Sequence, residues 1–311
     1  MITYYKNDET GLKRLEGLTK GCWVNVFDPT TNEIEQLADL GFPQDFITYP
    51  LDIDELARSE RDDEGTLFIL LRIPYYQGAK MDVPYVTIPL GIILTEDYII
   101  TVCRWENDIL RELASGRIRG LSTAKHNRFL LQILLSTATK YLTYLREINK
   151  AVDILEDKLQ LSMQNREMLE LLKHQKSLVY FTTALKSNEL MLERLQRSQL
   201  FRMYPEDEDL LEDVITENRQ AIEMSNISSN ILSSMMDAFA SIISNNLNFV
   251  MKFLASITVV LSIPTIVTSF FGMNVDFPTL FEQETSYLIV TGMIALISVL
   301  VIAIFARRNW F

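Results

Sequence analysis

Residues 253–271 read FLASITVVLSIPTIVTSFF, and residues 287–305 read YLIVTGMIALISVLVIAIF. Each stretch runs for 19 residues without a charged side chain. As a helix, either one spans about 28 Å, close to the roughly 30 Å of hydrocarbon in a bilayer. A core helix of a water-soluble protein would carry charges along one face, so the two stretches predict a pair of membrane-spanning helices.

Charged residues flank the two stretches unevenly. Lys252 precedes the first and Arg307 and Arg308 follow the second, whereas the connecting residues 272–286 contain acidic side chains and no basic ones. Lysine and arginine collect on the cytoplasmic side of membranes. We therefore expect a multi-pass protein of the cell (plasma) membrane, with both termini in the cytoplasm and an acidic loop outside.

Glycine divides the rest of the chain. Nine of the 11 glycines precede residue 121, and residues 121–271 contain none. A domain rich in strands needs frequent turns, so this gap predicts long helices. Before the gap, apolar runs predict strands at 22–27, 66–76, 83–94 and 98–103, with helices near 31–40 and 106–116.

The fold class expected from these patterns is an α+β (α/β) N-terminal cytosolic domain with a long helical stalk and two C-terminal transmembrane helices. Pro205 and the acidic residues after it indicate the start of the stalk helix, because carboxylates stabilise a helix N-terminus. The predicted divisions are a cytosolic α/β domain (1–120), a helical hairpin region (121–205), a stalk and pore helix that includes the first span (206–271), an outer loop (272–286), the second span (287–306) and a basic tail (307–311).

Composition excludes several classes of protein. A chain that is 48% hydrophobic is too apolar to be disordered, and a net charge of −12 disfavours binding to nucleic acid, which usually needs a basic face. The two cysteines and two histidines are isolated, which disfavours a structural metal site or Cys/His catalysis. We find no glycine-rich phosphate loop and no protease motif, so we expect neither an enzyme nor an organic cofactor.

The first span differs from the second because it carries a stripe of hydroxyl groups. Thr258, Ser262, Thr265 and Ser269 follow one another at steps of 4, 3 and 4, which places them on one face of a helix. The same face continues backward through mostly small or polar residues to an acidic one: Ala255, Met251, Asn248, Ser244, Ala240 and Asp237.

Two interpretations of this stripe compete. The hydroxyl groups could simply bond back to their own helix and allow close packing of a neighbour. A stripe that continues into the cytosolic helix favours a water-lined path instead. One helix cannot enclose a path, so this second interpretation predicts a symmetric homo-oligomer, with Met251 and Leu254 as bulky groups near the inner mouth.

The stripe ends at Gly272-Met273-Asn274. Gly272 can end the helix with a positive φ and allow a close approach of backbone, and Asn274 then places an amide oxygen at the outer mouth. Neutral amide oxygens can hydrogen-bond the water shell of a hard divalent ion without removing it. That property suits Mg²⁺, which gives up its water reluctantly.

With these features the sequence resembles the CorA family of divalent-cation (Mg²⁺/Co²⁺) channels and transporters. The shared features are Gly272-Met273-Asn274 after the first of two C-terminal spans, a short outer loop and the basic end Arg307-Arg308-Asn309-Trp310. The order of elements agrees across essentially the whole chain, although residues 1–120 match only in pattern.

The resemblance implies a funnel-shaped homopentamer that passes hydrated Mg²⁺, and also Co²⁺ or Ni²⁺. Asn274 would form the selectivity ring, Asn248 and Thr265 would line the pore, Leu254 would be a hydrophobic gate, and Asp237 would be an acidic pore position. Mg²⁺ would be both cargo and regulatory ligand, since the family closes when cytosolic Mg²⁺ binds between subunits. Asp213 falls at one such carboxylate, and its partner would be Asp52 or Asp54.

The chain departs from the family pattern at three positions. Phe271 precedes Gly272 where many members have tyrosine, Ser262 replaces a bulkier apolar residue, and the pore proline is displaced to Pro264. Two alternatives stay open at this point: a transporter of Zn²⁺ or another transition metal with the same architecture, and a non-conducting membrane-tethered sensor or adaptor.

Overall fold

The computed structural model describes residues 1–8, 11–63, 65–116, 118, 120–162, 165–197, 205–273, 286–308 and 310. It divides into two compact units, Met1–Ser234 and Met235–Phe311, and helix α6 (Pro205–Phe271) contributes to both. The predicted fold class is confirmed, because a mixed α/β N-terminal part is followed by long helices that include two of membrane length.

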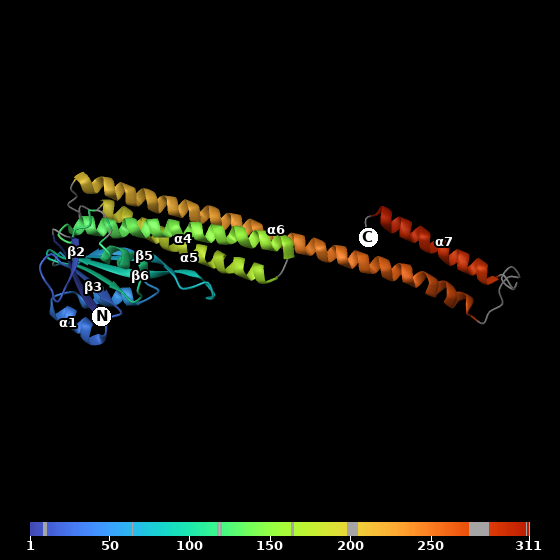
Figure 1. Ribbon diagram of the computed structural model, residues 1–311, viewed down its shortest axis with the longest axis horizontal. Coiled ribbons are helices and arrows are strands. Elements are labelled where there is room, and N and C mark those ends of the chain that lie inside the picture. Colours follow the sequence, from blue (N-terminus) through green and yellow to red (C-terminus); the bar gives the residue numbers. More distant parts are fainter. Residues whose placement is uncertain are drawn as a thin grey trace. The chain divides into compact units, whose positions relative to one another are not determined.

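A seven-stranded sheet forms the centre of the first unit (Figure 1). Its strands lie in the order β2-β1-β3-β7-β6-β5-β4, and β3 and β7 pair in parallel while the other neighbours pair antiparallel. Their bounds are β1 (Ile2–Asp8), β2 (Gly11–Leu15), β3 (Trp23–Phe27), β4 (Arg58–Arg61), β5 (Leu67–Tyr76), β6 (Tyr85–Leu94) and β7 (Ile99–Cys103).

The four strands predicted from apolar runs are confirmed as β3, β5, β6 and β7. The prediction missed β1, β2 and β4. Strands β2 and β4 lie at the two edges of the sheet, and their sequences, GLKRL and RSER, are mostly polar. An edge strand that is half open to water needs no apolar run, so hydrophobicity alone did not reveal it.

Both faces of the sheet are covered by helices, as the alternation along β5 shows. Leu67, Ile69 and Leu71 join one apolar cluster with the long helices, whereas Phe68 and Leu70 join a second cluster with the short ones. The short helices on that second face are α1 (Thr31–Asp39), α2 (Gln44–Thr48) and the 3-10 turn η1 (Tyr49–Leu51).

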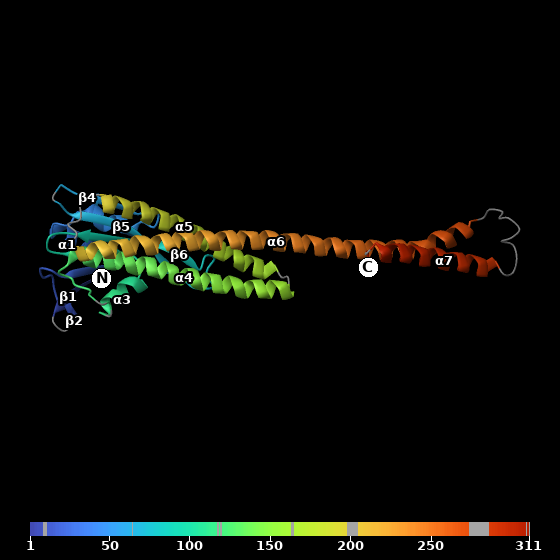
Figure 2. The ribbon, with the colours of Figure 1, turned by 90° about the horizontal axis from the view of Figure 1, so that it is seen from above.

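The first face carries α3 (Asp108–Ala114), α4 (His126–Ser162), α5 (Asn165–Arg197) and the first part of α6 (Figures 1 and 2). Helices α5 and α6 run antiparallel, since Leu185 of α5 bonds Asn218 and Gln175 bonds Ser233. The helices predicted near 31–40 and 106–116 correspond to α1 and α3, and α6 begins at Pro205 as expected.

The second unit consists of the last part of α6 and helix α7 (Ser286–Arg307). Both helices are long and apolar enough to cross a membrane. Almost none of either apolar stretch is buried within the chain. So large an exposed apolar surface would be covered by a membrane or by further copies of the chain.

Candidate pore helix and cytosolic acidic turn

The stripe predicted on α6 lies at the surface of the chain. Ser262 is half-buried, and the other candidate positions are exposed: Asp237, Asn248, Met251, Leu254, Thr258, Thr265 and Ser269. Met251 and Leu254 are each 58% exposed, which is unusual for large apolar side chains unless something outside the chain covers them.

Helix α7 covers a different face of α6. The two helices meet around an apolar hollow lined by Ile257, Val260 and Leu261 of α6 and Ile302 of α7. None of these three α6 residues belongs to the stripe. The stripe therefore remains available to a second copy or to water after α7 has packed.

Hydroxyl groups of the stripe donate to their own helix, as the first of the two interpretations expects. Thr258 and Ser262 donate to the carbonyl groups of Leu254 and Thr258, each over 2.8 Å, and Thr265 donates to Leu261 over 3.4 Å. A hydroxyl has one proton to donate and two lone pairs. Because the proton is committed to the backbone, the oxygen presents only acceptor capacity to whatever lies beside the stripe.

Helix α6 ends at Phe271, immediately before Gly272, as predicted. Gly272 does not have the positive φ that we expected. It is instead close to the preceding turn: an added Cβ would lie 3.2 Å from the carbonyl oxygen of Thr268, which also accepts the Gly272 N–H over 2.9 Å. Met273 is exposed, and Asn274 lies outside the described residues.

The three candidate regulatory carboxylates are all exposed. Asp213 lies on α6, and Asp52 and Asp54 lie in the turn that follows η1. Among the described residues, no group of three His, Cys, Asp or Glu side chains could hold a metal ion within one chain. The structure does not bring Asp213 and the acidic turn together in one chain, and the prediction that they meet between subunits stays a prediction.

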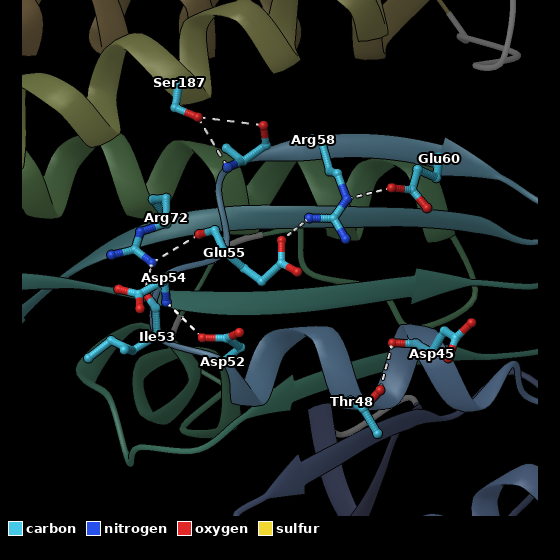
Figure 3. Close-up of polar contacts among 11 residues, drawn as sticks. Asp45, Thr48, Asp52, Ile53, Asp54, Glu55, Arg58, Glu60, Arg72 and Ser187 are labelled. Carbon is cyan, nitrogen blue, oxygen red and sulfur yellow. Dashed lines mark hydrogen bonds and ion pairs between the residues drawn. The ribbon is translucent and has the colours of Figure 1, made fainter.

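Residues 52–57, which we call the acidic turn, are held by several hydrogen bonds and ion pairs (Figure 3). Within the turn, the Asp52 carboxylate accepts the N–H of Asp54 over 3.0 Å. Arg58 pairs with Glu55, and Arg72 of β5 donates to the carbonyl oxygens of Ile53 and Glu55 over 2.5 and 3.0 Å. The carboxylates are thus carried on a fixed backbone.

Sequence reasoning did not single out Arg72. The signal available was one cation inside the otherwise uncharged strand LFILLRIPYY. Burial lowers the pKa of Arg72 below its ordinary value, because the guanidinium is largely withdrawn from water. A buried arginine needs oxygen acceptors, and such a residue within a core strand therefore indicates a polar structure nearby.

The sequence is similar to proteins of known family. The sequence matches the family described as "CorA-like Mg2+ transporter protein" over residues 19–308. It is 29% identical to the cobalt/magnesium transport protein CorA of Methanocaldococcus jannaschii over 299 residues, covering 93% of this chain and 90% of that protein. It is 23% identical to the cobalt/magnesium transport protein CorA of Thermotoga maritima over 309 residues, covering 93% of this chain and 83% of that protein.

The fold agrees with a solved structure of the same kind. The complete structure of the CorA magnesium transporter from Methanocaldococcus jannaschii superposes with a TM-score of 0.86 and 24% identity, covering 100% of this chain and 99% of that one. The match to the family description spans most of the sequence and includes both helices of membrane length. This chain is a member of the CorA family of Mg²⁺ transporter proteins.

Proposed function

We propose that this chain forms a channel-type transporter for hydrated Mg²⁺ that also passes Co²⁺ and Ni²⁺. The observation that carries the proposal is the stripe on α6 between Asp237 and Gly272, which is exposed apart from the half-buried Ser262 and whose Thr258 and Ser262 hydroxyl oxygens are left as acceptors. The water shell of a cation points its hydrogens outward, so a wall of acceptors can bond to it. A ring of copies, as in the homopentamer that the family resemblance implies, would enclose the path.

Selection would occur at Asn274, whose neutral amide oxygen can bond the hydrated ion without removing its waters. The connecting segment that contains Asn274, residues 272–286, carries acidic side chains and no basic ones, and this negative charge raises the local concentration of cations. Uptake into vesicles reconstituted with the purified chain tests the proposal directly. We expect entry of Mg²⁺, Co²⁺ and Ni²⁺ down their gradients, and absence of Mg²⁺ entry would contradict it.

Leu254, which lies beside the stripe near the expected inner mouth, is proposed as the hydrophobic gate. Exposed apolar side chains that meet around a narrow pore exclude water and so block hydrated ions. Replacing Leu254 with asparagine should raise Mg²⁺ flux at high internal Mg²⁺ by about tenfold or more, equivalent to about 1.4 kcal/mol removed from the barrier. Leu254→Met keeps an apolar side chain and should behave as the unmodified protein. Equal flux through both variants would argue against a gate at this position.

The proposed orientation places both termini in the cytoplasm of a cell whose plasma membrane holds the protein. Lys252 precedes the first span and Arg307 and Arg308 follow the second, and Trp310 stacks on Phe305 at the same end of α7; basic and aromatic residues at these ends support a cytoplasmic location for them. The Met1–Ser234 unit would therefore sample internal Mg²⁺.

Internal Mg²⁺ is proposed to close the channel by binding between the exposed Asp213 of one copy and the acidic turn of the next. Cation binding favours the closed state only to the extent that this state binds more tightly. Replacing Asp213 with alanine should raise the half-inhibiting internal Mg²⁺ concentration about tenfold, which is typical of coupling between two sites. Its neighbour Glu212 is also exposed and provides the control, since Glu212→Ala should leave inhibition unchanged. An unchanged inhibition curve for Asp213→Ala would sink this regulatory role.

The two alternatives are less well supported. A zinc pathway would gain from soft ligands, yet all four Cys and His residues precede residue 175, far from the stripe in sequence. A non-conducting sensor or adaptor would not need an uncovered polar stripe, and it would tolerate the loss of Asn274. Flux measured with Zn²⁺ beside Mg²⁺ separates the first alternative, and the Asn274 variant discussed below separates the second.

A further inference from the structure

Arg72 is a hub of hydrogen bonds between parts of the chain that are far apart in sequence. Its main chain and side chain together contact the acidic turn, strand β6, helix α4 and helix α5. It lies within β5, between the face covered by the long helices and the turn that carries Asp52 and Asp54 (Figure 3).

The main-chain N–H and C=O of Arg72 are hydrogen-bonded by a side chain instead of by a neighbouring strand. The Arg72 N–H and C=O point to the edge of β5 on which β4 lies, and β4 pairs with β5 only as far as Leu70. Asn188 of α5 supplies the missing partner. Its Oδ1 accepts the Arg72 N–H over 3.0 Å, and its Nδ2 donates to the Arg72 carbonyl over 2.8 Å.

These bonds are protected from water. Asn188 is 2% exposed, and the hydroxyl of the fully buried Tyr141 in α4 donates to the same Arg72 carbonyl over 3.0 Å. A buried amide whose donor and acceptor are both used cannot rotate or withdraw without leaving polar groups unsatisfied. Asn188 therefore fixes α5 to one point on the sheet.

The side chain of Arg72 extends the same junction to the acidic turn. Besides the carbonyl groups of Ile53 and Glu55, its guanidinium bonds the carbonyl and hydroxyl oxygens of Thr87 over 2.7 and 2.8 Å. The residue before Asn188, Ser187, accepts the N–H of Ala57 at the end of the turn over 3.1 Å. Two consecutive residues of α5 thus hold the turn, one directly and one through Arg72.

The same stretch of α5 is bonded to α6. The carbonyl of Leu185 accepts a hydrogen bond from Asn218, and Glu189 pairs with Arg219 over 3.4 Å. About one turn earlier in α5, Thr182 bonds Ser225 of α6 over 2.8 Å. A displacement of the acidic turn can therefore reach α6, the helix that carries the stripe, through contacts that all lie in the Met1–Ser234 unit.

We propose that Arg72 and Asn188 form a buried joint that couples the acidic turn to α5, and through α5 to α6. Both are positioning residues: neither touches the transported ion, and they determine whether a change at the turn is transmitted to the pore helix. This inference rests on the proposed inhibition by internal Mg²⁺, for which the joint supplies the mechanical connection.

The test measures how Mg²⁺ flux through the full-length protein in vesicles depends on internal Mg²⁺. Replacing Asn188 with alanine should raise the half-inhibiting concentration about tenfold while flux at low internal Mg²⁺ stays unchanged. Ser177→Ala is the matched control. Ser177 is also a buried residue of α5 that bonds the sheet, at the N–H of Tyr85, but it does not contact Arg72 or the turn.

If the role of Asn188 were purely structural, Asn188→Ala would lower the melting temperature and leave the inhibition curve unshifted, and that result would overturn the proposal. If Asn188→Ala does not fold, Arg72→Lys keeps the charge and the main-chain bonds but loses the planar guanidinium that bonds the carbonyl groups of Ile53, Glu55 and Thr87. It should shift the curve in the same direction, and an unshifted curve would equally overturn the joint. Absence of inhibition in the unmodified protein would instead reject the proposed regulation itself.

Discussion

Replacing Asn274 with alanine is expected to reduce Mg²⁺ uptake by about two orders of magnitude. A hydrogen bond to a charged partner contributes about 1.5–3 kcal/mol, so losing even one such bond at the selecting step corresponds to a roughly 10–150-fold change. A ring of copies would lose one amide from each copy, which moves the expected effect toward the upper end. Alanine is small enough that the change removes the ligand without blocking the path.

The measurement is Mg²⁺ uptake by cells starved of Mg²⁺, with the amount of protein in the membrane checked for every variant. Gln283→Ala is the matched control, because it removes an amide from the same connecting segment outside the Gly-Met-Asn tripeptide. We expect Gln283→Ala to transport normally. Uptake that survives Asn274→Ala unchanged would favour a membrane-tethered sensor or adaptor without a pore.

The parts of this fold that follow from local sequence were predictable, and those that depend on distant pairing were not. The two membrane helices are evident from 19 uncharged residues each, and β5 and β6 from long apolar runs. Strand β1, in contrast, contains Lys6, Asn7 and Asp8, and it is a strand because β2 and β3 pair with it on both sides. Its conformation is determined by pairing with neighbouring strands more than by its own residues.

The candidate site divides in the same way. The stripe on α6 is a property of one helix, so the spacing of Thr258, Ser262 and Thr265 was enough to find it. The joint joins residues 116 positions apart, Arg72 and Asn188, and neither residue has a local pattern that names the other. In the sequence Asn188 is an ordinary polar residue of a long helix, and only the folded sheet brings the Arg72 main chain next to it.

Gly91 provides the second large expected effect, because it leaves room for the turn that carries the acidic residues. It lies in β6, paired with Leu70 and Val102. A Cβ added there would lie 2.2 Å from Cγ of the buried Pro50 in η1, which is far inside contact distance. Neither a central strand nor a proline ring can rotate away, so η1 would have to lift from the sheet.

Replacing Gly91 with alanine should therefore destabilise the first unit by about 1–3 kcal/mol, as overpacking of a core does. The gain in strand propensity from glycine to alanine is smaller, at a fraction of the roughly 1 kcal/mol span of that scale. In a unit of this size each kcal/mol lowers the melting temperature by about 2–4 °C. Gly17→Ala is the control, because nothing lies within 4 Å of its added Cβ, and it should melt with the unmodified protein.

The contact with Pro50 also predicts a rescue and a functional consequence. Pro50→Ala removes the overlapping Cγ, so the double variant should regain part of the stability lost in Gly91→Ala, an interaction that a double-mutant cycle isolates. Because Asp52 follows η1 directly, lifting η1 moves the acidic turn off the support that Arg72 provides. Gly91→Ala should thus weaken inhibition by internal Mg²⁺ in the same direction as Asn188→Ala, and Gly17→Ala should not. A destabilised Gly91→Ala protein with an unshifted inhibition curve would show that the position of the turn does not govern closure.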